Sequence, residues 1–265
     1  MITILKNFND DQRNFEYKCL CSTFNIIRAY DHNIDCYQDS INLDYTECNI
    51  KHIPHTPINH LYGLNSINLR SDELVPVSSG THIVFGGCSQ TWGHGIERKK
   101  DLWSYIVNQN FKDSAGYYNL GRGGWNTSQI VADAIAYCNG FGMPKYMFLL
   151  FPEIDREVVT FLSKTTKETK LSKSESRYLN LLQTQSTFLS LMAIENFCAV
   201  NNITLRYSTW HPGTTYQYSK WKLKNFLPLF DINNPDKFFF SKLQNDGHWA
   251  VTHNKKFAEM VLESL

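Results

Sequence analysis

The chain has 265 residues, of which 42% are hydrophobic and 14% aromatic, enough to bury one sizeable core together with a smaller addition. Its 26 basic and 25 acidic residues leave a formal net charge of +1, so no overall field favours nucleic acid or an anionic membrane as a partner. We therefore expect the partner to be a small or neutral molecule.

No stretch of the sequence approaches the roughly 20 apolar residues that a membrane-spanning helix needs. The first six residues, 1–6, lack the longer apolar segment of a signal peptide. The seven cysteines are odd in number and scattered, which favours reduced thiols over a disulfide framework. We expect a cytoplasmic protein that contacts no membrane.

Residues 1–79 differ from the rest in being rich in Asn, Asp, Tyr and Cys without a sustained helical period. We interpret them as an irregular, partly β extension that precedes a main domain at 80–265. His52, His55 and His60 lie close together in this extension, but no carboxylate or cysteine stands at ligand spacing, so a loop is favoured over a metal site. No metal and no cofactor are expected.

From residue 80 onward, strands are predicted to alternate with helices. Short apolar runs predict strands at 82–85, 117–120, 146–151 and 204–208. Helical periods are expected at 101–107, 126–138, 179–200 and 252–264, with Asp101 and either Asn126 or Thr127 as caps. This alternation predicts a parallel sheet with helices on both faces, a three-layer α/β/α fold.

A glycine-rich segment, Gly86-Gly87-Cys88-Ser89, follows the first predicted strand directly. In open parallel sheets, ligands bind beyond the carboxyl ends of the strands, and a serine on a sharp turn presents its hydroxyl and backbone N–H outward. The segment lacks the Lys-Ser/Thr ending of a P-loop, so nucleotide binding is disfavoured. A plain strand-to-helix turn is the other interpretation. Cys88 is a rival nucleophile, ranked lower because it is expected to face the core.

Two further segments occupy similar positions. Residues 119–127 follow the second strand and contain small residues whose backbone N–H groups could stabilise an oxyanion. Residues 245–249 precede the last helix and contain Asp246 and His248. An acid two residues from a histidine can orient the imidazole if the loop curls, although an isolated Asp-x-His is more often a surface turn.

Together and in this order, the three segments resemble those of the SGNH (GDSL-like) hydrolase superfamily. Gly-Cys-Ser-x-Thr-x-Gly at 87–93 is similar to the family's Gly-Asp-Ser-x-Thr-x-Gly, with Cys88 in place of the Asp. Residues 119–124 are similar to the second block. Asp-x-His-Trp at 246–249 is most similar to the form found in SGNH-like polysaccharide O-acetyltransferases. The resemblance spans residues 80–265 and implies a flavodoxin-like α/β/α fold.

The resemblance also implies roles for particular residues. Ser89 would be the nucleophile, His248 its base and Asp246 the acid that orients His248, while the backbone N–H groups of Ser89 and Gly124 would form the oxyanion hole. The implied function is a serine ester hydrolase that cleaves a short acyl ester from a small molecule or a carbohydrate, for example an O-acetyl group.

The chain departs from the family in its third block, which usually reads Gly-x-Asn-Asp and supplies an oxyanion donor from its Asn. Residues 151–156 contain no asparagine. We expect Asn126, two residues beyond Gly124, to substitute for it. Two alternatives stay open: a catalytically weakened module that binds or has a structural role, and an O-acyltransferase acting on a glycan, which Asp-x-His-Trp suggests.

Tryptophans occur in or near all the segments expected to form the site. Aromatic faces suit sugar rings, so these residues are candidate substrate contacts, with core packing as the other interpretation. The candidates are Trp92, Trp125 and Trp249.

Overall fold

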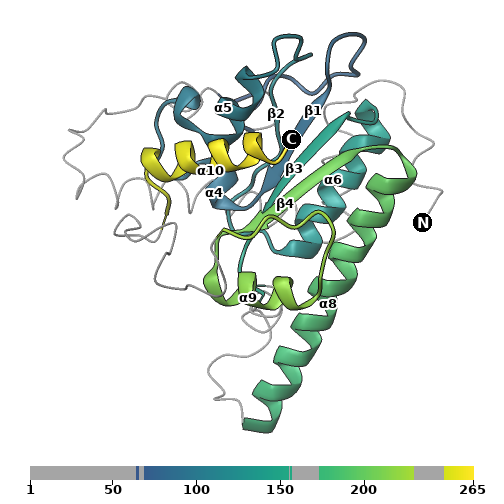
Figure 1. Ribbon diagram of the computed structural model, residues 1–265, viewed down its shortest axis with the longest axis vertical. Coiled ribbons are helices and arrows are strands. Elements are labelled where there is room, and N and C mark those ends of the chain that lie inside the picture. Colours follow the sequence, from purple (N-terminus) through teal and green to yellow (C-terminus); the bar gives the residue numbers. More distant parts are fainter. Residues whose placement is uncertain (1–63, 66–68, 155, 157–172, 230–247) are drawn as a thin grey trace.

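The computed structural model describes residues 64–65, 69–154, 156, 173–229 and 248–265 (Figure 1). The expectations for residues 1–63, including the histidine group at 52–60, and for Asp246 therefore lie outside the described residues.

Four parallel strands form one sheet in the order β2-β1-β3-β4. Their bounds are β1 Ile83–Gly87, β2 Tyr118–Asn119, β3 Tyr146–Phe151 and β4 Thr204–Thr209. Phe85 of β1 is in register with Asn119 on one side and with Phe148 on the other. All five residues of β1 are buried, as expected of a strand covered on both faces.

Helices cover both faces of this sheet, as Figure 1 shows. The α-helices are α4 Ser89–Trp92, α5 Trp103–Gln109, α6 Thr127–Phe141, α8 Lys173–Val200, α9 Pro212–Lys220 and α10 Val251–Glu263. One core cluster joins α5 and α10 to the Phe85 and Phe148 side of the sheet, and another joins α6 and α8 to the Met147 and Leu149 side. The predicted three-layer α/β/α fold is confirmed.

No helix in the described part of the chain is both long enough and apolar enough to cross a membrane.

The first turns of α6 and α5 differ in whether a nearby or a distant residue satisfies their backbone N–H groups. Asn126 caps α6 as predicted: its side chain accepts from the Gln129 N–H, and the Gln129 side chain accepts from the Asn126 N–H. Asp101 does not cap α5, contrary to the prediction. It ends a short 3₁₀ helix, Lys99–Asp101, and pairs with Arg98 at 2.6 Å. The start of α5 is instead satisfied from α10, because the Asn254 side chain accepts from the Trp103 N–H.

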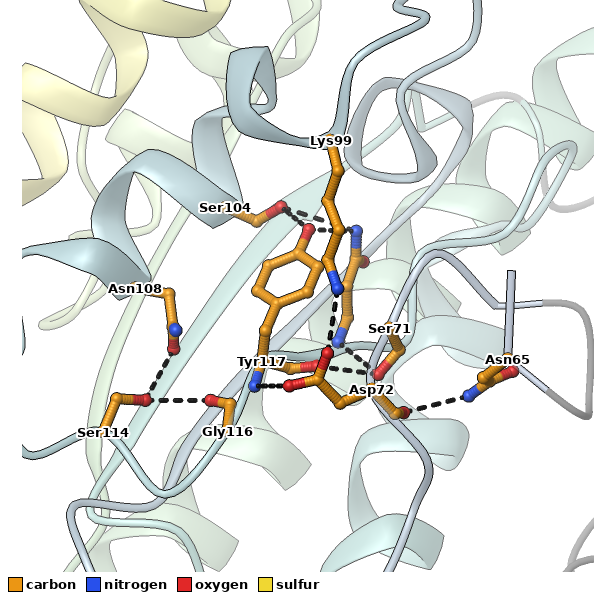
Figure 2. Close-up of polar contacts among 10 residues, drawn as sticks. Asn65, Ser71, Asp72, Lys99, Ser104, Asn108, Ser114, Gly116 and Tyr117 are labelled. Carbon is orange, nitrogen blue, oxygen red and sulfur yellow. Dashed lines mark hydrogen bonds and ion pairs between the residues drawn. The ribbon is translucent and has the colours of Figure 1, made fainter. Parts of the chain in front are cut away.

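Residues 69–74, which the sequence interpretation placed in the extension, pack on the sheet. Asp72 exchanges hydrogen bonds with Tyr117 next to β2: its backbone N–H donates to the Tyr117 carbonyl and its carboxylate accepts from the Tyr117 N–H, each at 2.8 Å (Figure 2). The Lys99 ammonium lies 2.9 Å from the same carboxylate. Leu69 and Leu74 share a core cluster with Val84 of β1. This lead-in therefore belongs to the packed body, while the division of the chain near residue 80 stays a prediction.

Candidate active site

Residues 86–95, the end of β1 and the turn that follows it, are called the serine turn. Ser89 is the first residue of α4, a single helical turn that Gly93 ends with a φ of 87°. The Gly93 N–H donates to the Ser89 carbonyl at 2.8 Å. Gly87 has to be a glycine, because a Cβ there would lie 2.7 Å from the Leu150 carbonyl oxygen of β3. The glycines thus allow Ser89 to sit at the carboxyl end of a buried strand.

His248 reaches this turn from the other end of the chain. Its Nε2 lies 3.0 Å from the Ser89 hydroxyl, across a separation of 159 residues. The next residue is fixed to the turn as well, since the Trp249 N–H donates to the buried Gln90 side chain at 3.0 Å. A nucleophile and a base are therefore within hydrogen-bonding distance, the arrangement that activates a serine. Asp246 lies outside the described residues, so its predicted role is untested.

Cys88 and Ser89 are neighbours with opposite surroundings. Cys88 is fully buried in the core cluster on the α6 side, and burial raises the pKa of its thiol above the usual value. Ser89 retains 8% of its surface and bonds His248. The prediction that Cys88 faces the core is confirmed, and a neutral buried thiol is a poor nucleophile.

The two glycines of the second segment, residues 119–127, have different surroundings. A Cβ at Gly121 would lie 2.5 Å from the backbone nitrogen of Trp92, so this glycine lets the segment pack directly on α4. Asn119 links the same two segments, because its side chain donates to the Thr91 carbonyl and accepts from the Gly121 N–H. Gly124 has a φ of 75°, and apart from its two chain neighbours no described residue has an atom within 4 Å of a Cβ built on it. It thus lies at an open position in the loop between β2 and α6.

Asn126, the expected substitute donor, is 9% exposed and engaged in the cap of α6. Its side-chain oxygen accepts from the Gln129 N–H at 2.9 Å. Only its amide nitrogen could donate to an oxyanion. Its part in an oxyanion hole stays a prediction.

The segment after β3, residues 152–156, is called here the β3 exit. Glu153 pairs with Arg156 at 2.7 Å, and the Ile154 N–H donates to the Thr214 hydroxyl of α9 at 3.2 Å. The Pro152 carbonyl accepts from the Thr209 hydroxyl. No amide side chain occurs among the described residues of this segment, so it offers no side-chain counterpart of the family's third-block asparagine.

The three tryptophans expected to contact substrate are largely buried. The Arg70 guanidinium lies 5.5 Å from the Trp92 ring and that of Arg122 lies 4.7 Å from the Trp125 ring. Trp249 is 1% exposed and packs in the core on the α10 side, which favours the packing interpretation for this residue. Substrate contact by Trp92 and Trp125 stays a prediction.

Sequence reasoning missed two residues beside the pair. The His94 ring lies against the His248 ring, with centroids 4.3 Å apart and planes tilted by 36°. Arg70 is fully buried and donates to backbone carbonyls of the serine turn and the residues after it. The signal for His94 was its place between Gly93 and Gly95, and the signal for Arg70 was its place in the Asn-x-x-x-Leu-Arg-Ser run at 65–71.

Within the described ranges, no group of three or more His, Cys, Asp or Glu residues is arranged to hold a metal ion.

Comparisons with known proteins found only distant similarity to solved structures. No family model and no curated protein matches the chain. A solved structure of a G-D-S-L family protein from Desulfitobacterium hafniense DCB-2 is 13% identical, with 70% of this chain and 99% of that chain covered and a TM-score of 0.47. A member of the lipolytic protein G-D-S-L family from Veillonella parvula DSM 2008 is 10% identical, with 68% and 96% covered and a TM-score of 0.44. Functional conclusions therefore depend on the side chains of the site.

Proposed function

We propose that this chain is a serine ester hydrolase with Ser89 as nucleophile and His248 as base. The observation that carries the proposal is the 3.0 Å contact between the Ser89 hydroxyl and the His248 Nε2 at the carboxyl end of β1. Catalytic hydrogen bonds between a nucleophile and its base have this length, and ligands of parallel sheets bind at this edge.

In the proposed reaction, His248 accepts the proton of Ser89 as the hydroxyl oxygen attacks the carbonyl carbon of an ester. The backbone N–H groups of Ser89 and Gly124 donate to the resulting oxyanion. His248 then returns the proton to the alcohol, which leaves as the carbon–oxygen bond breaks. Water, deprotonated by His248, then attacks the acyl carbon, and His248 returns this proton to the Ser89 oxygen as the bond to the acyl group breaks. Asp246 orients the imidazole throughout.

The β3 exit bears on the rate of this reaction. Loss of one oxyanion donor costs on the order of a hundred- to a thousandfold in turnover. Because Glu153 and Ile154 supply no amide N–H from a side chain, we expect slow turnover unless the Asn126 amide takes part. The substrate we propose is a short acyl ester, such as an O-acetyl group on a carbohydrate.

The test compares two neighbouring variants with p-nitrophenyl acetate as substrate. Ser89→Ala removes the nucleophile and is expected to abolish hydrolysis above the uncatalysed rate. Cys88→Ala, the matched control, is expected to keep turnover within about threefold, because the thiol is buried away from the reaction. Unchanged turnover in Ser89→Ala, or loss confined to Cys88→Ala, would refute the assignment.

A second candidate, a weakened binding module, is favoured by the composition of the β3 exit. Labelling with a fluorophosphonate probe separates the two, since only an activated serine reacts. A labelled Ser89 in the unmodified protein, lost in His248→Ala, supports an enzyme. Product formation that requires a sugar acceptor would instead indicate acyl transfer.

A further inference from the structure

We infer that His94 is a positioning residue for His248, holding the ring of the base in the orientation that directs Nε2 to Ser89. This inference rests on the proposed function and assigns a role to a histidine that the family motif does not include.

The two imidazole rings lie in contact at a tilt. Their centroids are 4.3 Å apart and their planes are tilted by 36°, close to the separation of offset-stacked aromatic pairs. His94 is partly exposed, and its backbone N–H donates to the Ser89 carbonyl at 3.0 Å. His94 is thus tied to the nucleophile through its backbone and to the base through its ring.

The loop that carries His94 is held on both sides by one buried side chain. Arg70 is 0% exposed, and its guanidinium donates to the carbonyls of Gly93 at 2.9 Å and Glu97 at 3.0 Å, and also to that of Ile96. An arginine keeps its charge when buried, so carbonyls that accept from it are strongly bound. The chain on either side of His94 is therefore a firm support for a stacked ring.

The base needs such a support. The bond from Trp249 N–H to Gln90 fixes the backbone beside His248, but it leaves the side-chain torsions of His248 to be set by packing. A small rotation of the ring would move Nε2 away from the serine hydroxyl, and misplacement of about 1 Å can cost a hundredfold in rate. The flat face of His94 restricts that rotation.

His94 and an orienting acid would support the imidazole of His248 in different ways. Hydrogen bonds from an orienting acid would engage the edge of the imidazole, whereas His94 contacts its face. The two kinds of support therefore act on different parts of the ring and do not replace each other.

Three variants test the role with p-nitrophenyl acetate. His94→Ala is expected to lower kcat about tenfold with KM changed less than twofold, because an orienting group acts on the transition state and not on substrate binding. His94→Phe keeps a stacking ring and is expected to stay within about threefold of the unmodified protein. Glu97→Ala alters an exposed side chain of the same loop and is expected to change neither constant.

Full activity in His94→Ala would overturn the inference. Equal loss in His94→Ala and His94→Phe would also overturn it, since the imidazole itself rather than a stacked ring would then be required. If fluorophosphonate fails to label the unmodified protein, the proposed function fails separately. In that case NMR of the His248 ring decides: broadened ring signals in His94→Ala, which report motion of the ring, support the positioning role, and signals as sharp as in the unmodified protein refute it.

Discussion

The carboxyl ends of β1 and β3 lie side by side, with Gly87 in register with Leu150, yet the segments that follow them differ. The serine turn after β1 receives contacts from three distant parts of the chain, through Arg70, Asn119 and His248. In the β3 exit, Glu153 pairs with Arg156, three residues away. The first segment offers a hydroxyl and an imidazole to a ligand, while the second joins two of its charged side chains to each other.

This difference shows that the end of a parallel strand offers a position for a functional site, and that the side chains there decide whether a ligand can bind or react. Both segments follow buried parallel strands, where ligands bind in sheets of this kind. At the serine turn, the supporting contacts go largely to backbone carbonyls, such as those of Thr91 and Gly93, which leaves the Ser89 hydroxyl to His248. At the β3 exit, the Glu153 and Arg156 side chains pair with each other, while the backbone groups of Pro152 and Ile154 bond Thr209 and Thr214.

Removing the base, His248, should have the largest effect on activity. His248→Ala is expected to lower kcat/KM for p-nitrophenyl acetate by about 10³-fold or more, because the serine hydroxyl then lacks its proton acceptor. The double variant with Ser89→Ala should be no worse than either single variant, since both residues act in one step. Additive losses would contradict this shared role.

Removing the hydrogen bonds that Arg70 makes to the serine turn should lower the stability of the protein. Arg70→Met leaves the carbonyls of Gly93 and Glu97 without their buried donor and is expected to lower the free energy of unfolding by about 2–4 kcal/mol in urea titrations. Arg98→Ala is the control: its side chain is 64% exposed and its pair with Asp101 should contribute less than about 1 kcal/mol. Equal losses in the free energy of unfolding of the two variants would refute the supporting role of Arg70.

Giving the β3 exit an amide should make the two strand ends more alike. Ile154→Asn is expected to raise kcat about tenfold, part of what an oxyanion donor supplies in a preorganised site. Ile154→Leu, which adds no donor, should leave kcat within twofold. Because Ile154 packs partly against the core on the α6 side, thermal unfolding should be followed for both variants. No gain in Ile154→Asn would show that this position does not face the oxyanion.

The last expected effect is one of pH, and it lies at the opposite end of β1. His82 is buried beside Tyr137, and burial lowers its pKa from 6.5 to about 4, against a smaller raising effect of its hydrogen bond to the Met143 backbone. The unfolded chain binds more protons between these values, so the contribution to stability is complete above pH 6.5 and is lost as the pH falls toward 4. Urea titrations should show a slope of about 1 kcal/mol per pH unit, reduced in His82→Phe. An unchanged slope in His82→Phe would show that His82 does not cause this pH dependence of stability.

Much of the fold was predictable because apolar periodicity reports burial directly. The β3 prediction matches its observed bounds, 146–151, and the Asn126 cap has a purely local cause, its exchange of hydrogen bonds with Gln129. Asp101 was assigned wrongly as a cap because the group that satisfies the start of α5, Asn254, lies 151 residues away. Helix α9 was missed, since its residues Pro212–Lys220 carry little apolar period.

The sequence by itself determined the layered architecture, the glycines that allow a serine at the end of β1, and the order of Ser89, Gly124 and His248 along the chain. Only the tertiary structure decided that His248 Nε2 lies 3.0 Å from the Ser89 hydroxyl and that the His94 ring lies against the His248 ring. It also decided that Arg70 donates to the carbonyl of Gly93, beside His94. The reason is physical: periodicity and glycine act within a few residues, whereas a hydrogen bond or a ring stack depends on how distant segments pack.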